Sequence, residues 1–181
     1  MKIRHGFVSN SSSSSFVLAF EFLPKTVGDM IKVLFGDVPE DTQIPYEYNS
    51  NEDNPLFFSV KKIAETVFAD IKKAEAKEEE IVEEFSSSHT ATSKAKEIFI
   101  AEKGIDKEDY YRLPYEEKDY NREDVLAKEE GKKMFQEFKK RLRPGTRFTI
   151  VNYSDNDGPF NCHMEHGGIF DRMPHVQVSH H

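Results

Sequence analysis

The chain lacks most of the features that place a protein quickly in a specialised class. It has no Trp and a single Cys, Cys162, among 181 residues, so an intrachain disulfide is excluded and a reducing compartment is expected. No apolar run approaches the length of about 20 residues that a membrane-spanning helix needs. The longest apolar piece near the N-terminus, residues 16–20, is too short for a signal-peptide core. We therefore expect a cytoplasmic protein with no membrane partner.

Basic residues are also scarce relative to acidic ones. The chain has 25 Lys and Arg against 33 Asp and Glu, a formal net charge of -8. Nonspecific nucleic-acid binding is disfavoured, because that class usually carries a basic excess that neutralises phosphates. The hydrophobic share of 37% and the aromatic share of 12% are enough for a globular core. The length suits a single domain over residues 1–181.

A central strand is predicted close to the N-terminus. In segment 15–22, SFVLAFEF, the large apolar side chains share one face, while Val17 and Ala19 occupy the other. A strand that is apolar on both faces usually lies in the middle of a sheet.

Helical patterns fill the middle of the chain. Thr26 and Asp29 form a capping box for a helix that Gly36 ends. Ser59 caps a second helix, whose pattern continues into the acidic segment 75–84 as an expected solvated extension. A third helix ends at Gly104, and a fourth is capped by Asn121. The intervening segments are a surface loop at 37–55, an acidic helix end and Ser-rich turn at 75–93, and a charged connection at 105–121.

The last part of the chain has strand character. Segment 146–153 alternates, Asp157 and Gly158 are typical of a hairpin tip, and residues 161–166 would return as a strand. A terminal strand is expected at 175–181. We predict an α+β fold in which the N-terminal strand joins a C-terminal antiparallel sheet, with about four helices inserted between them.

This topology would bring both chain ends together at a polar site. Five of the seven His residues fall after position 162. If that site holds a divalent metal, imidazole with carboxylate suits zinc, manganese or iron, and His163 and Glu165 would share one side of a strand. The predicted metal ligands are Asp155, Asp157, His163, Glu165, His180 and His181. Turn residues and surface histidines are the ordinary explanation of the same pattern.

An anionic, phosphate-containing ligand is the other candidate for this site. Ser hydroxyls and successive backbone N–H groups can cradle a phosphate. The ordinary explanation of the same tract is a polar loop whose Ser side chains bond only to their own backbone. The partner would be a phosphorylated small molecule or a nucleotide. The predicted binding residues are Arg4, His5, Ser9, Asn10, Ser11, Ser12 and Ser13.

The sequence leaves open whether the protein is an enzyme. His163 and His166 are candidates for a general base, and Glu165 is a further catalytic candidate. No G-x-S-x-G motif supports a serine nucleophile.

Both ends of the chain carry a family resemblance. The N-terminal string KIRHGFVSNSSSSSFVL, with SDNDGPF, MEH and SHH near the C-terminus, resembles a family of proteins from tailed bacteriophages and some bacteria. The resemblance implies a phage origin and a host cytoplasm as the location. No activity is established for that family, so no catalytic residue is transferred.

An interaction protein is the alternative function. A phage-encoded acidic protein would bind and modulate a host or defence protein, with aromatic residues among charges as the anchors. The predicted contact consists of segments 75–84 and 37–55 and residues Tyr110, Tyr111, Tyr115 and Tyr120.

Overall fold

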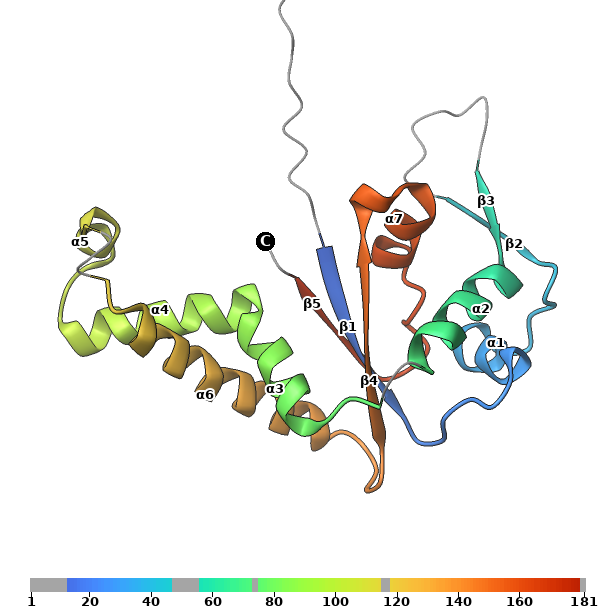
Figure 1. The fold of residues 1–181 in the computed structure, drawn as a ribbon, viewed down its shortest axis with the longest axis horizontal. Helices are drawn as coiled ribbons and strands as arrows, with labels where there is room; N and C mark the ends of the chain where they lie inside the picture. Colours follow the sequence, from blue (N-terminus) through green and yellow to red (C-terminus); the bar gives the residue numbers. More distant parts are fainter. Residues whose placement is uncertain (1–12, 47–55, 73–74, 115–117, 180–181) are drawn as a thin grey trace, which may run out of the picture.

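The computed structural model describes residues 13–46, 56–72, 75–114 and 118–179. It confirms the α+β class: the N-terminal strand β1 (Ser13–Phe20) lies between β4 (Arg147–Ser154) and β5 (His175–Ser179) in an antiparallel sheet of order β4-β1-β5 (Figure 1). In the described part of the chain, six helices rather than about four lie between β1 and β4. The helices are α1 (Val27–Phe35), α2 (Val60–Ile71), α3 (Glu78–Ser87), α4 (His89–Lys103), α5 (Lys107–Arg112), α6 (Tyr120–Lys139) and, after β4, α7 (Pro159–His166).

Different helices cover the two faces of the sheet (Figure 1). Phe16, Leu18 and Phe20 pack with apolar residues of α1, α2 and α7 on what we call the α7 face. Val17 and Ala19 pack with residues of α3 and α6 on the opposite side, the α6 face. Because both faces are covered, β1 is buried from Ser14 to Phe20, as a central strand requires.

The predicted caps at Thr26, Ser59 and Gly104 are confirmed. The Thr26 hydroxyl accepts from the Asp29 N–H at 3.0 Å, while the Asp29 carboxylate accepts from the Thr26 N–H at 3.0 Å. Ser59 caps α2 by accepting from the Lys62 N–H at 3.1 Å. Gly104 ends α4 in the left-handed region, with a φ of 64°.

Several predicted boundaries are wrong. β1 begins at Ser13 and ends at Phe20, and Phe22 is 85% exposed rather than part of a strand. The acidic segment is not an extension of α2 but the separate helix α3, which buries Ile81 and Phe85 against α6. The cap of α6 is Asp119, which accepts from the Arg122 N–H, and not Asn121.

The predicted hairpin after β4 is the largest error. Residues Asp155–Asp157 form the 3-10 turn η2, and Pro159–His166 form helix α7. Gly158, with a φ of 97°, makes the bend between them. Pro159 explains the outcome, because proline suits the first position of a helix but cannot donate to a strand ladder.

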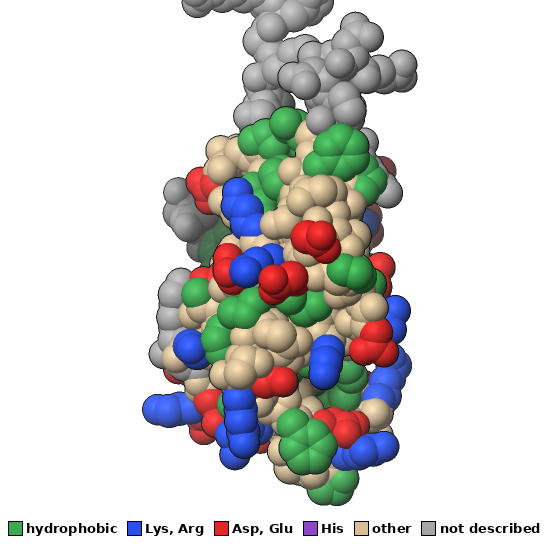
Figure 2. Space-filling model, turned by 90° about the vertical axis from the view of Figure 1, so that its right-hand side faces the viewer, with side chains coloured by type: hydrophobic (Ala, Val, Ile, Leu, Met, Phe, Trp, Pro, Cys, Tyr) green, Lys and Arg blue, Asp and Glu red, His purple; other side chains and the backbone are tan. Residues whose placement is uncertain are grey.

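Two features lie beyond the sheet. The predicted loop 37–55 contains the short strand β2 (Gln43–Pro45). It pairs with β3 (Phe57–Ser59), which follows the loop, as a small second sheet. Hydrophobic side chains gather at the upper end of the face shown in Figure 2, and charges of both signs are interspersed below them. On the other side of the molecule, α4, α5 and the first half of α6 form a helical arm that extends away from the sheet (Figure 1).

The arm has a small apolar cluster of its own, whose buried residues are Ala95, Phe99, Tyr110, Leu126 and Ala127. Among the described residues, no helix has the length and apolar character needed to span a membrane.

Candidate functional site

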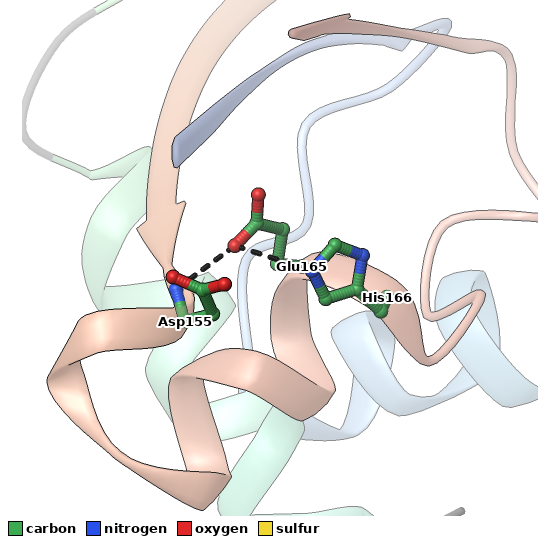
Figure 3. Close-up of side chains that lie close together, drawn as sticks. All are labelled: Asp155, Glu165 and His166. Carbon is green, nitrogen blue, oxygen red and sulfur yellow. Dashed lines mark hydrogen bonds and ion pairs between the residues drawn. The ribbon is translucent and has the colours of Figure 1, made fainter. Parts of the chain in front are cut away.

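A polar cluster forms around Glu165 where β1 begins and β4 ends (Figure 3). The Ser14 hydroxyl donates to Glu165 Oε1 at 2.8 Å, and the Asp155 backbone N–H donates to Oε2 at 2.9 Å. His166 Nε2 lies 3.6 Å from the same Oε2. The Glu165 side chain is 0% exposed. A buried carboxylate is therefore held by Ser14 of β1 and by the segment that follows β4.

Gln177 ties the third strand to this cluster. Its side-chain amide donates to the Ser14 hydroxyl at 3.1 Å and to the Glu165 backbone carbonyl at 3.4 Å. Ser15 lies on the opposite face of β1, where its hydroxyl bonds to the Asn152 amide oxygen at 2.5 Å. The end of the Ser-rich tract is thus part of the strand, and its hydroxyls bond to side chains on both faces.

Asp155, Glu165 and His166 form a group of possible metal ligands. One ligand atom from each residue lies within 4.8 Å of the other two. Ligands at about 2.0–2.2 Å from a zinc ion are about 3–3.5 Å apart, so the group would have to contract slightly. Glu165 is buried, whereas Asp155 is half-buried and His166 is exposed.

A cavity of about 290 Å³ borders the same cluster. Its floor includes Phe16 and Phe170, and its polar lining comes from α7, from the segment after it and from β5. The polar side chains are those of Glu165, His166, Asp171, His175 and Gln177. A small polar molecule would therefore lie next to the carboxylate of Glu165 and the imidazole of His166.

The predicted site residues fall into distinct groups. Asp155, Glu165 and His166 come together, while Asp157 lies in η2 outside that group. Ser13 pairs with Ser154 at the start of β1. The remaining candidates lie outside the described residues; they are Arg4, His5, Ser9, Asn10, Ser11, Ser12, His180 and His181.

His163 and Glu165 do not share one side, as the predicted strand required. In α7 each residue turns the helix by about 100°, so these two side chains lie on nearly opposite sides. His163 is buried between aromatic rings, with its centroid 5.3 Å from Phe58 and 6.1 Å from Tyr46. Of the two histidines proposed as bases, only His166 borders the cavity.

The sequence predicted that the Ser tract up to Ser15 would lie near Asp155 and Glu165, without singling out Ser14, and it missed Gln177 as a member of this cluster. Gln177 stands between Val176 and Val178, so strand alternation alone would have placed it on the face opposite the valines. The partners of both residues depend on strand pairing, which the sequence did not supply in detail.

The residues proposed for protein interaction also separate. In the acidic helix, Glu78 pairs with Lys139 at 3.1 Å and Glu80 caps α3 through the Lys77 N–H at 2.8 Å. Tyr110 is buried, whereas Tyr111 is 59% and Tyr120 38% exposed. Tyr115 lies outside the described residues.

No protein-family model, curated protein or solved structure matches this chain. The function is therefore inferred from the geometry of the site.

Proposed function

We propose that the protein binds a divalent transition-metal ion through Asp155, Glu165 and His166. The observation that supports this function is a buried carboxylate with a second carboxylate and an imidazole gathered within 4.8 Å. Zinc, manganese and iron accept such a mixed set of oxygen and nitrogen ligands.

The charge of the cluster favours a cation over a free anion. Asp155 and Glu165 are like charges in close proximity, and a cation between them offsets their mutual repulsion. A phosphate-containing ligand would meet the same carboxylates unfavourably unless a metal lay between. The adjoining cavity of about 290 Å³ gives such a ligand a place beside the metal.

Metal content and titration test the proposal directly. The untagged chain, with His180 and His181 removed so that they supply no ligand, is dialysed and its metal content is measured by mass spectrometry. Zinc and manganese are then titrated into the metal-free protein by calorimetry. We expect saturable binding of one ion, weakened at least about tenfold in Glu165→Gln and in His166→Ala, because each removes a ligand.

Asp157→Asn is the matched control for these variants. It changes a carboxylate in the same turn that lies outside the triad, so metal affinity should stay within about twofold of the wild type. Glu165→Gln keeps an oxygen that accepts from Ser14, which separates loss of a ligand from loss of folding. Absence of saturable binding, or equal binding by Glu165→Gln, would refute the proposal.

Metal affinity should also fall as the pH is lowered. Protons compete with the metal for the imidazole and the two carboxylates, because the ligands must be deprotonated to bind it. We expect weaker binding at about pH 5.5 than at about pH 7.5. An affinity that is unchanged over this range would contradict a site containing His166.

The exposed tyrosines on the arm favour a second candidate function, an acidic, phage-encoded protein that modulates a host or defence protein. Tyr111 and Tyr120 are the exposed aromatic residues of the predicted contact. A pull-down from host lysate should lose its partner with Tyr111→Ser/Tyr120→Ser. Full retention of the same partner would count against this function.

A further inference from the structure

β5 is an edge strand whose outer side is available for pairing. In the described ranges, β1 is the one strand that pairs with it. The Ala19 N–H donates to the Pro174 carbonyl at 3.0 Å, which fixes the alternation of hydrogen bonds along this pair. The backbone groups of Val176 therefore point toward β1, and those of His175 and Gln177 point away from it.

In the described ranges, no segment covers the outward groups of β5, in contrast to the other edge of the sheet. At β4, the Ala76 N–H donates to the Phe148 carbonyl at 2.9 Å, so the segment before α3 covers part of that edge. Proteins usually protect open edges with proline, lysine or bulges. The sequence HVQVS of β5 has none of these within the strand, and only Pro174 precedes it.

A cavity of about 330 Å³ flanks β5 on the α6 face. Val176, Phe85, Met134 and Phe138 provide its apolar surface. The buried carboxylate of Glu130 at its rim is already paired, with Lys94 at 3.0 Å and Lys133 at 2.5 Å. What this cavity offers is mainly contact for an apolar side chain.

The cavity on the α7 face has the opposite character. It is bordered by His175 and Gln177 of β5, Glu165 and Asp171 also contribute to its lining, and no Lys or Arg does. Glu165 is buried, whereas Asp171 is exposed. A basic side chain would complement this charge.

We propose that the β5 edge binds an extended peptide segment of a partner protein as a fourth, antiparallel strand of the sheet. The backbone N–H and C=O groups of an extended peptide can bond to the outward backbone groups of an edge strand, which is the basis of β-augmentation. Side chains of the added strand alternate between the two faces. Apolar residues enter the α6-face cavity, and basic residues between them face the exposed carboxylate of Asp171.

This inference does not depend on the proposed metal site, and the test is carried out with EDTA present. The probe is a fluorescein-labelled peptide of about six residues, the usual length of a strand, that alternates Val and Lys. Binding to the full chain is followed by fluorescence anisotropy. We expect saturable binding that weakens at least about tenfold when Glu replaces Lys, because the acidic side chains would face Asp171.

The position of N-methyl groups on the peptide tests the pairing without changing the protein. In an antiparallel pair, the residues opposite His175 and Gln177 exchange hydrogen bonds with them and share their face. These are the Lys residues of the probe. Methylation of the Lys amides should abolish binding, and methylation of the Val amides should leave most of it. Equal effects of both would overturn the proposal.

A pair of protein variants completes the test. Gln177→Pro removes the outward N–H, whereas Gln177→Val removes the same side chain and keeps the N–H. We expect peptide binding to be lost in the first and to remain saturable in the second, which keeps the backbone donor. Binding retained by a folded Gln177→Pro, no saturable binding, or a concentration-dependent dimer that replaces peptide binding would each overturn the proposal.

Discussion

The sheet and the helical arm are built in different ways. The sheet joins segments far apart in the chain, since β1 pairs with both β4 and β5. The arm is built from neighbouring helices between His89 and the middle of α6. The sheet has extensive apolar packing on both faces, whereas the arm has one small cluster.

The arm compensates with buried polar pairs. The Tyr110 hydroxyl donates to the buried Glu123 carboxylate at 2.7 Å. At the base of the arm, in the second half of α6, the buried Glu130 is paired with Lys133 and with Lys94 of α4, and these hydrogen bonds lower the pKa of its carboxyl. Regions with few apolar contacts open locally at lower free energy than a core does. The comparison therefore predicts a stable sheet and an arm that unfolds first.

The largest effect should come from truncating the core of each region. Phe16→Ala removes a buried ring that contacts Phe170 at a centroid distance of 4.8 Å, and Phe99→Ala removes the buried ring of the arm cluster. Such changes cost about 3–5 kcal/mol. We expect Phe16→Ala to lower the free energy of global unfolding in urea, and Phe99→Ala to increase amide hydrogen exchange mainly in α4, α5 and the first half of α6.

Equal losses of protection throughout the chain in both variants would contradict the distinction between the two regions. Circular dichroism at the start of each experiment verifies that the variants are folded.

A smaller effect is expected at the joint between α3 and α6. A Cβ at Gly131 would lie 2.8 Å from the backbone nitrogen and 2.9 Å from the Cα of Ser86, so Gly131→Ala forces the helices apart. We expect a loss of about 1–3 kcal/mol in the free energy of unfolding, although alanine favours helices.

Gly28 in α1 is the matched control for this prediction. The nearest atom to its added Cβ is the Thr26 hydroxyl oxygen at 3.6 Å, an ordinary contact. Gly28→Ala should therefore stabilise the protein by about 0.5–1 kcal/mol in urea unfolding. A stabilising Gly131→Ala would show that the joint is looser than the contact distances imply.

The last comparison concerns the hydrogen bonds of the two buried tyrosines, Tyr110 and Tyr153. Tyr110→Phe leaves the carboxylate of Glu123 buried without its donor and should cost about 1–3 kcal/mol. Tyr153 donates to Asp70 at 3.2 Å, but Asp70 is half-buried and water can replace the hydroxyl, so Tyr153→Phe should cost about 0.5–1 kcal/mol. Urea unfolding at neutral pH measures both values; a larger cost for Tyr153→Phe would reverse the comparison.

Alkaline pH offers a further measurement on the same tyrosines. Burial, and then interaction with a carboxylate, raises the pKa of Tyr110 and of Tyr153. A raised folded-state pKa gives stability that is present below the unfolded tyrosine value and is lost as pH rises, here above about pH 10. The free energy of unfolding should fall there, and less steeply in Tyr110→Phe/Tyr153→Phe. An equal slope in both proteins would contradict the assignment.

Local signals were enough to predict much of the sheet and its first helices. The apolar pattern of β1 predicted its central position, and the side chains of Thr26, Asp29 and Ser59 predicted where α1 and α2 begin. The error at α7 arose because Asp157 and Gly158 fit a hairpin as well as a bend. Pro159 was not interpreted as the first residue of a helix.

The sequence alone predicted that the N-terminal strand and the C-terminal strands belong to one sheet, because apolar and alternating patterns a few residues long mark each strand. Only the tertiary structure decided that α7 turns Glu165 toward the sheet and His163 away from it. The bond between Ser14 and Glu165 joins positions 151 residues apart. Such a pairing depends on how the strands and α7 pack together, which short-range periodicity does not encode.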